Sequence, residues 1–321
     1  SGTSVTFAVA SGGGSRLPSS AVTTNSSGIA ALTSWTLGTT AGSNTLTATS
    51  GSLSGSPITF TATGTAGAAS QLVRTTAAAG TASGATFTTQ PVISLQDANS
   101  NVVITDSASV VTASVSAGGT LLGTTTATAV NGVATFTDLG ISATAGNTYV
   151  ITYSSGALTP VTQNVTVTAG AATQVVLTTS AAGATYGNTW TTQPVVQIQD
   201  SAGNVRTTDS SSVITISVST GGAIVGTATA TASSGVATFS GLALTGAPAT
   251  YTLTYSTGAL TSATQVLALS QASQLVTFGA LSTKTYGDAA FGLSATASSG
   301  LSVTFASADS SICSVSGSAV S

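Results

Sequence analysis

The residues best placed to do chemistry are four aspartates that recur in two pairs. Asp97 and Asp106 are nine residues apart, and so are Asp200 and Asp209. One interpretation is a calcium site, because hard cations take clustered carboxylate, Asn and carbonyl oxygens. The other is that Asp97 and Asp200 cap the turns that follow them, with their carboxylates accepting backbone N–H bonds. We favour capping, because two carboxylates per repeat would bind calcium weakly, and we expect neither a metal nor any other cofactor.

The chain lacks the residue types that most enzymes use for acid and base catalysis. It contains no histidine, and its seven acidic residues are all aspartates. A Ser-His-Asp or Cys-His arrangement therefore cannot be assembled, and proton transfer would fall to scattered Asp side chains. The three glycines at 12–14 are not followed by the Lys-Ser/Thr of a phosphate-binding loop. We predict that the chain is not an enzyme.

Charged residues make up only 3% of the chain, and the net charge is -3. This composition excludes a basic surface for nucleic acid and a polybasic membrane patch. Apolar residues reach 41%, but Ser, Thr and Gly interrupt them before any run is long enough to span a bilayer. We therefore expect no nucleic-acid partner and no membrane insertion in this segment. The low charge also removes repulsion between copies, which favours self-association.

Two long stretches of the chain repeat each other at an offset of 103 residues. The sequence TTQPV at 88–92 returns at 191–195, and GVATF at 132–136 returns at 235–239. A period near 100 residues is a whole small domain and is too long for one unit of a solenoid or propeller. The sequence therefore predicts a tandem array of domains.

Apolar residues alternate with Ser, Thr and Gln along both copies, which is the pattern of half-buried β-strands. Turn-forming pairs such as Asn131-Gly132 and Gly221-Gly222 separate these runs. About seven short strands per hundred residues, without helical periodicity, predict a two-sheet sandwich. The two copies agree on the inward-facing residues, which are Ile93, Leu95, Val111, Ala113, Val115, Tyr149, Ile151, Tyr153, Val165 and Val167 in one and Val196, Ile198, Ile214, Ile216, Val218, Tyr251, Leu253, Tyr255, Leu267 and Leu269 in the other.

The sequence Thr-Ala-Gly-Ala-Ala at 65–69 and 168–172 marks the predicted boundaries. These junctions are short and apolar rather than rich in Gly and Ser, which favours an extended, semi-rigid rod. The two ends match only parts of a repeat, so we expect the chain to be a segment of a longer polypeptide. The predicted domains are a partial one at 1–66 (the second half of a repeat), complete ones at 67–169 and 170–270, and a partial one at 271–321 (the first half).

Three stretches resemble bacterial immunoglobulin-like repeats of the invasin and intimin type, which occur in giant surface adhesins and secreted repeat proteins. They are TTQPVVQIQDSAGNV (191–205), TNSSGIAALTSWTLGTTAGSNTLTA (24–48) and KTYGDAAFGLSATASSGLSVTF (284–305). The resemblance covers essentially the whole chain. It implies tandem immunoglobulin-like β-sandwiches outside the cell or at its surface. It also implies that a last domain of this kind often carries a second cysteine that pairs with the position of Cys313, the only cysteine here.

Function is then expected to be structural, as an adhesin stalk or as the protomer of a surface filament or sheath. The partners would be other copies of the chain, end to end or side by side, or a host surface reached through regions outside this segment. An array of carbohydrate-binding modules is the alternative, because aromatic faces stack on sugars. Trp35 and Trp190 are the candidates, but they align with Leu139 and Phe87, and the tyrosines at 149, 153, 251 and 255 fall on inward faces.

Overall fold

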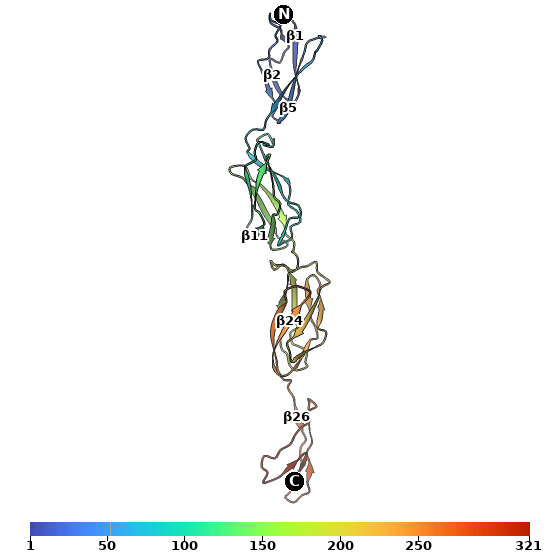
Figure 1. The fold of residues 1–321 in the computed structure, drawn as a ribbon. Helices are drawn as coiled ribbons and strands as arrows, with labels where there is room; N and C mark the ends of the chain where they lie inside the picture. The colour runs from blue at the N-terminus through green and yellow to red at the C-terminus, as the bar shows by residue number, and fades with distance from the viewer. Residues whose placement is uncertain (52) are drawn as a thin grey trace. The chain divides into compact units, whose positions relative to one another are not determined.

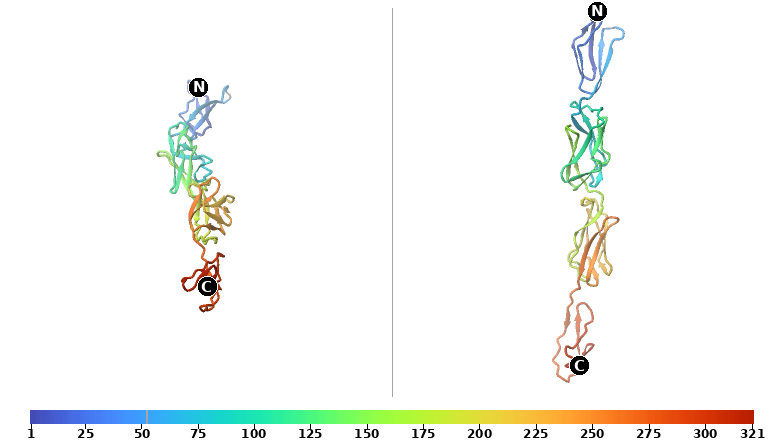
Figure 2. Two further views of the ribbon diagram at one scale, coloured as in Figure 1. Left: turned by 60° about the horizontal axis from the view of Figure 1, so that its bottom comes forward. Right: turned by 60° about the vertical axis from the view of Figure 1, so that its left-hand side comes forward.

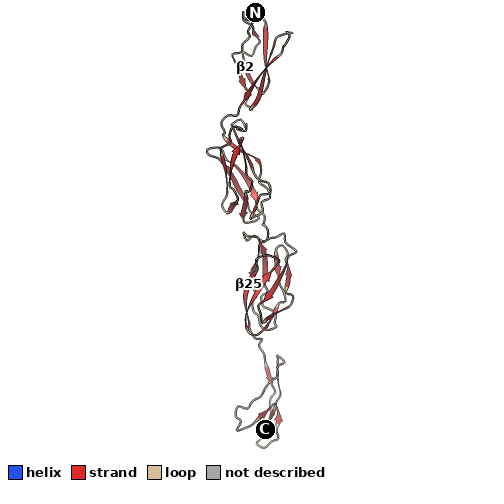
Figure 3. Cartoon of the chain, viewed as in Figure 1, coloured by secondary structure: helices blue, strands red, loops and turns tan. Residues whose placement is uncertain are grey.

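The computed structural model describes residues 1–51 and 53–321, and these residues form strands and loops only (Figure 3). Thr and Val fill the strands because β-branched side chains pack well on a pleated surface and lose rotamer freedom in a helix. The prediction of an all-β fold is confirmed. Within the same residues no helix is long and apolar enough to cross a membrane.

Internal contacts divide the chain into two compact units. The first comprises Ser1–Val176, Gln197–Ser210 and Ser233–Val236, and the second comprises Leu177–Val196, Ser211–Ala232 and Ala237–Ser321. The sequence repeats at 67–169 and 170–270 are called the first and second complete repeats. Their boundaries as separate domains stay a prediction.

Residues 1–66, blue in Figure 1, form antiparallel strands whose buried apolar side chains include Phe7 and Leu46. The strands are β1 (Ser4–Ser11), β2 (Gly14–Leu17), β3 (Val22–Thr23), β4 (Ser34–Leu37), β5 (Gly42–Thr49) and β6 (Ile58–Gly64). One sheet has the order β3-β1-β5-β6, and β2 pairs with β4.

The first complete repeat contains ten strands, where the sequence predicts about seven. The extra ones are short, such as β8 and β13, and arise where the chain turns back along a sheet. The strands are β7 (Gln71–Thr76), β8 (Ala85–Thr86), β9 (Val92–Gln96), β10 (Val110–Val115), β11 (Gly119–Leu122), β12 (Thr126–Val130), β13 (Val133–Thr135), β14 (Gly140–Ala143), β15 (Thr148–Ser154) and β16 (Val161–Thr166).

These ten strands form a long sheet, β16-β15-β10-β12-β13-β9-β7, and a short one, β11-β14-β8. Figure 2 shows the cyan early strands and green later strands of this repeat packed within one body. The turn between β12 and β13 is Asn131-Gly132, and both residues have positive φ, 50° and 75°, as a tight hairpin requires. At the far ends of the long sheet, Gln71 of β7 bridges Thr159 in parallel, so its two edges meet around the core.

The core of this repeat contains the predicted inward-facing residues. Ile93, Leu95, Val111 and Tyr153 are fully buried, Val115 packs against them while partly exposed, and Phe136 lies 5.7 Å from Tyr153 between ring centroids. Burying such side chains is the main stabilising term in a domain of this size. The predicted strand faces are therefore confirmed.

The second complete repeat follows with β17 (Gln174–Thr179), β18 (Val195–Gln199), β19 (Val213–Val218), β20 (Gly222–Val225), β21 (Thr229–Thr231), β22 (Val236–Thr238), β23 (Ala243–Gly246), β24 (Ala249–Ser256) and β25 (Ala263–Leu269). Its sheets have the orders β17-β18-β22, β21-β19-β24-β25 and β20-β23. Residues 271–321 add β26 (Val276–Phe278), β27 (Phe291–Gly292), β28 (Ala295–Ala297), β29 (Val315–Ser316) and β30 (Ala319–Val320), in the sheets β26-β28 and β27-β30-β29.

Strand pairing in residues 1–66 follows that of the later half of a complete repeat. β1 pairs with β3 and β5 as β10 pairs with β12 and β15, and β5 pairs with β6 as β15 pairs with β16. The β2–β4 ribbon corresponds in the same way to the β11–β14 pair. That residues 1–66 are the second half of a repeat stays a prediction.

Candidate functional site

The turn after β9 is organised by the side chain of Asp97. Its Oδ1 accepts hydrogen bonds from the backbone N–H groups of Asn99 and Asn101, both at 2.9 Å, and Asp97 N–H donates to the Asn101 carbonyl at 3.0 Å. These are the capping bonds that the sequence predicts. We call Asp97–Asn101 and its copy, Asp200–Asn204, the junction turns.

Asn101, the last residue of the first junction turn, reaches back to residues before the repeat. Its Oδ1 accepts the Ala41 N–H at 2.8 Å, and its Nδ2 donates to the Thr39 carbonyl at 2.8 Å and to Asp97 Oδ2 at 2.9 Å. All four residues belong to the first unit. One amide side chain therefore joins the junction turn to a loop about 60 residues earlier in the chain.

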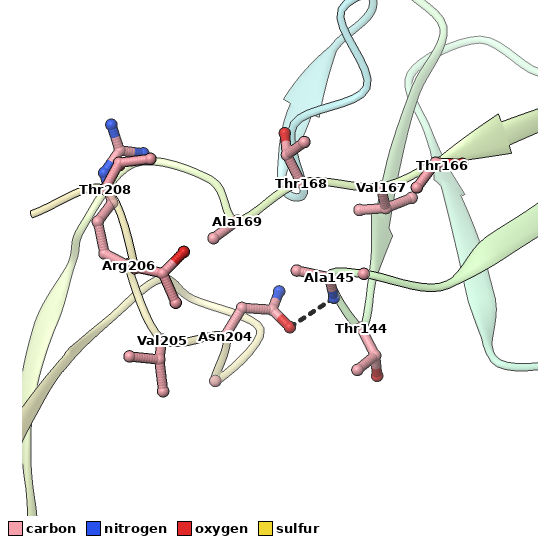
Figure 4. Close-up of a pocket in the computed structure, with 13 residues that line it drawn as sticks. Thr144, Ala145, Thr166, Val167, Thr168, Ala169, Asn204, Val205, Arg206 and Thr208 are labelled. Carbon is pink, nitrogen blue, oxygen red and sulfur yellow. Dashed lines mark hydrogen bonds between the residues drawn. The ribbon is translucent and has the colours of Figure 1, made fainter. Parts of the chain in front are cut away.

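Asn204 makes the same contacts in the second copy. Its Oδ1 accepts the Ala145 N–H at 2.8 Å, and its Nδ2 donates to the Ala143 carbonyl at 3.0 Å and to Asp200 Oδ2 at 2.9 Å. Figure 4 shows the Asn204 amide directed at the Ala145 backbone. Asn204 is only 8% exposed and Asp200 only 1%, so both polar side chains are buried with their partners, as buried polar groups generally are.

The glycines of the repeated Thr-Ala-Gly-Ala-Ala sequence bind the same aspartates. The Gly67 N–H donates to Asp97 Oδ2 and the Gly170 N–H to Asp200 Oδ2, both at 2.8 Å. Gly170 must be a glycine, because a Cβ there would lie 2.0 Å from the Ser83 carbonyl oxygen. Arg206 also donates to the Gly170 carbonyl. The connecting peptide is thus held on both of its faces.

Hydrogen bonding sets the ionisation of the two junction aspartates. Bonds from the Asn101 side chain and backbone lower the pKa of Asp97 to about 2, with smaller contributions from Gly67 and Asn99. Burial alone would raise the pKa of Asp200, but bonds from Asn204, Gly170 and Ala202 outweigh it and lower that pKa. Both carboxylates are ionised at neutral pH. Each accepts hydrogen bonds from three backbone N–H groups and from one Asn side-chain amide.

The other two calcium candidates lie in a different turn. Asp106 Oδ1 accepts the N–H groups of Ala108 and Ser109, and its Oδ2 accepts the Ser109 hydroxyl at 2.7 Å, which lowers its pKa. Asp209 occupies the matching turn, where its carbonyl accepts the Gly235 N–H. Among residues 1–51 and 53–321 no three His, Cys, Asp or Glu side chains gather as a metal site. That these aspartates serve as turn caps rather than as calcium ligands stays a prediction.

Each junction turn lines a groove, and the two grooves are equivalent. The first contains residues 41–42, 63–66, 100–102 and 104–105, and the second contains 144–146, 166–169 and 203–208. Their cavity volumes are about 480 and 930 Å³. Arg206 in the second is the one ionisable side chain lining either. Neither groove holds the nucleophile and base that covalent catalysis needs.

Of the two tryptophan candidates, Trp190 is in the interior and Trp35 is half-buried. Trp190 is 3% exposed, like Phe87, its partner in the alignment. Trp35 is half-buried in β4, and its indole nitrogen is buried. The four inward tyrosines are buried as predicted. Tyr186 and Tyr286 are exposed, at 54% and 104%.

Sequence reasoning missed the amide side chains that join separate strands. Gln90, within the TTQPV sequence, donates to the carbonyls of Phe87 and Leu139 and accepts the Leu139 N–H, and Gln193 makes the same three bonds in the second copy. Asn101 and Asn204 lie in the turn-forming sequences Asn99-Ser100-Asn101 and Gly203-Asn204, which by themselves indicate only a turn. Their recurrence at the same offset as the aspartates was the available signal.

No protein-family model matches the chain, and no curated protein sequence matches it. Among solved structures it is similar to FdeC, an adhesin of Escherichia coli, with 18% identity over 74% of this chain and 76% of that chain, and a TM-score of 0.35. It is also similar to invasin, a bacterial integrin-binding protein (14% identity, 86% of this chain, 54% of that chain, TM-score 0.33). A β-glycosidase from Bacteroides vulgatus matches as well (11% identity, 63% of this chain, 25% of that chain, TM-score 0.27). The chain thus spans about half of the matched invasin chain and a quarter of the glycosidase chain.

Proposed function

We propose that this chain is a non-catalytic structural segment of a large extracellular bacterial repeat protein, in which tandem immunoglobulin-like sandwiches form an extended rod at the cell surface. The observation that carries the proposal is the pair of junction turns. In each turn the Asp side chain accepts a hydrogen bond from the connecting peptide, at Gly67 or Gly170. The Asn side chain of the same turn accepts one from an earlier loop, at Ala41 or Ala145. Side chains used in this way fix segments of chain to one another.

The small number of acid and base side chains in the sequence supports the same proposal. The chain contains no histidine and only four basic residues, and the grooves at the junction turns contain no pair of acid and base. A surface built from Ser, Thr, Gly and small apolar residues serves as a scaffold more readily than as a catalyst.

Exposed strand edges favour a filament or sheath over an isolated stalk. β6 lies at the edge of its sheet with Ile58 and Phe60 57% and 46% exposed, and β25 lies at the edge of another with Val266 68% exposed. Edge strands are normally protected by lysines or prolines. The only lysine is Lys284, which lies outside these strands, so copies of the chain can associate side by side or end to end.

Electron microscopy together with sedimentation velocity tests the proposal. A rod predicts thin, elongated particles; mass independent of concentration identifies a stalk, and regular fibres that grow with concentration identify a filament. Compact particles with the repeats folded onto one another would contradict both. The carbohydrate-binding alternative requires binding on a glycan array that Trp35→Ala abolishes, because the buried Trp190 presents no face to a sugar.

A further inference from the structure

The loop that each junction turn contacts is itself repeated. Residues 39–42 read Thr-Thr-Ala-Gly and residues 143–146 read Ala-Thr-Ala-Gly. In both, the first residue offers its carbonyl and the third its N–H to the Asn side chain of the junction turn. We call these two four-residue segments, 39–42 and 143–146, the acceptor loops. Because they supply backbone groups only, their requirement is for a free N–H at the third position.

The second complete repeat has the corresponding loop at 246–249. Gly246 pairs with Gly222 as Ala143 pairs with Gly119. The next residue confirms the alignment, because the Tyr251 hydroxyl donates to the Ala247 carbonyl as the Tyr149 hydroxyl donates to that of Thr144. The third position is therefore Pro248.

Proline at this position removes one of the two bonds. Pro248 has no backbone N–H, so the loop cannot donate to an Asn Oδ1 as Ala145 donates to Asn204. The carbonyl of Gly246 is the only partner left. In the corresponding loop of the second complete repeat, Pro248 thus removes the N–H donor and leaves the carbonyl acceptor.

The following segment has also lost the side chains that would use this loop. β28 pairs with β26 as β9 pairs with β7, and β9 leads directly into Asp97. After β28 the sequence is Ser-Ser-Gly-Leu-Ser-Val-Thr at 298–304, with no Asp or Asn. A groove lies here too, lined by Pro248, Gln271–Gln274 and Ser298–Ser299 among others. Its walls lack a junction-turn Asn, which lines each of the other two grooves.

We propose that the acceptor loop and the junction turn form a two-part docking code between successive repeats, and that the joint loss of the third-position N–H and of the Asp–Asn turn makes residues 270–274 a hinge. Where both parts are present, each repeat is fixed to the one before it by an Asn side chain and an Asp-bound glycine. Where they are missing, no hydrogen bond joins residues 246–249 to 298–304 among the described residues. This inference concerns stiffness and holds for a stalk and for a filament alike.

Backbone ¹⁵N relaxation of the full chain, measured at low concentration, tests the code. Amides of residues 1–66, 67–169 and 170–270 are expected to share one rotational correlation time, whereas those of 271–321 show a shorter one. A C-terminal segment that tumbles with the second complete repeat would overturn the hinge.

Two matched variants test the code itself. In Asn204→Ala, the first and second complete repeats should no longer share one correlation time, whereas residues 1–66 and 67–169 should still share theirs. In Asn101→Ala, residues 1–66 should separate from 67–169, whereas the two complete repeats should still share one correlation time. Unchanged core amide shifts in both variants show that the repeats remain folded. If both variants keep one correlation time with the core intact, the docking code is wrong. Neither result depends on whether fibres form. Failure of the docking code can therefore be distinguished from failure of the proposed structural function.

Discussion

At the scale of single residues, the oxygens of each junction aspartate accept N–H donors from nearby backbone and side-chain groups. Asp97 binds the N–H groups of Gly67, Asn99 and Asn101 and the amide of the Asn101 side chain. These donors take up the lone pairs that a cation would need. The same arrangement, rather than a nearby cation, accounts for the low pKa.

The low pKa of Asp97 makes the first junction sensitive to acid. Its folded pKa, about 2, lies below the ordinary value of 3.8, so ionisation stabilises the junction above pH 4, and that stability is lost as pH falls towards 2. In an NMR titration the Gly67 amide shift should therefore move with a midpoint near 2 and not near 3.8. Asp97→Asn should abolish the transition; a midpoint at the ordinary value would refute the bonding described.

Position 100 tests backbone strain in the junction turn. Ser100 has φ 67°, and its counterpart Gly203 has φ 82°, a region that costs a residue with a Cβ about 1 kcal/mol. Ser100→Gly should therefore stabilise the first junction turn by about 1 kcal/mol, and Gly203→Ser should destabilise the second by a similar amount. Hydrogen exchange of the Asn101 and Asn204 amides measures both. Changes of equal sign in the two variants would contradict this.

Tyr153 and Tyr255 occupy the same place in the two repeats but differ in one bond. The Tyr255 hydroxyl donates to Gln265 Oε1 at 3.1 Å, whereas the Tyr153 hydroxyl is buried without a partner in the described part of the chain, and burial raises its pKa to about 12. Tyr255→Phe should cost about 1 kcal/mol, and Tyr153→Phe should be neutral or stabilising. Global hydrogen exchange of each core measures the difference, and an equal loss in both variants would refute it.

At the scale of elements, single amide side chains join strands that the chain keeps far apart. Gln90 precedes β9 and binds Leu139 beside β14, 49 residues away. Gln163 of β16 similarly binds both backbone groups of Ala78, and Gln265 those of Ala181. Such bonds satisfy backbone groups at places where no neighbouring strand can.

Gln90 provides the prediction at this scale. Gln90→Ala leaves the Leu139 N–H without its partner and removes one of the two donors to the Leu139 carbonyl, the other being the Phe87 N–H. It should therefore destabilise the first complete repeat by about 2 kcal/mol. Gln193→Ala should do the same to the second. Hydrogen exchange of the core amides of the first complete repeat measures the effect of Gln90→Ala. Chemical denaturation followed by Trp190 fluorescence measures that of Gln193→Ala. Exposed Gln271→Ala serves as the control, and a similar change there would count against the interpretation.

At the scale of the whole molecule, the same Asn and Gly contacts recur at two junctions, whereas at the third only the carbonyl of the loop remains. The identical places share an acceptor loop, a glycine and an Asp–Asn turn. At the third place Pro248 and the Ser-rich turn replace them. Stiffness along the chain is thus set by a few residues at each junction.

The whole chain should also be indifferent to calcium. Because the aspartate oxygens are already bonded to N–H groups, removing free calcium with a chelator should leave the melting temperature unchanged. Adding calcium in excess should likewise have no effect. A loss of several degrees with chelator, restored by calcium, would show that the turns bind metal after all.

Much of the fold could be predicted because its signals are local. Alternation with period two fixes which face of each strand is apolar, and the second copy repeats that alternation, so the burial of Ile93, Tyr153, Ile198 and Tyr255 followed from the sequence. The role of Asp97 as a turn cap was equally local, because its bonds reach only four residues ahead. The short strands β8 and β13 were not predictable, since two or three residues carry no periodicity.

The sequence by itself thus determined the all-β class, the repeat and the inward faces, because these depend on residues that are close neighbours in the chain. Only the tertiary structure decided what Asn101 and Asn204 do. Their partners lie about 60 residues away, and an amide that binds backbone atoms leaves no complementary residue type at the other end to be recognised. It also decided that Pro248 stands where Ala145 donates, since that equivalence is set by strand pairing and a tyrosine hydroxyl rather than by similarity of sequence.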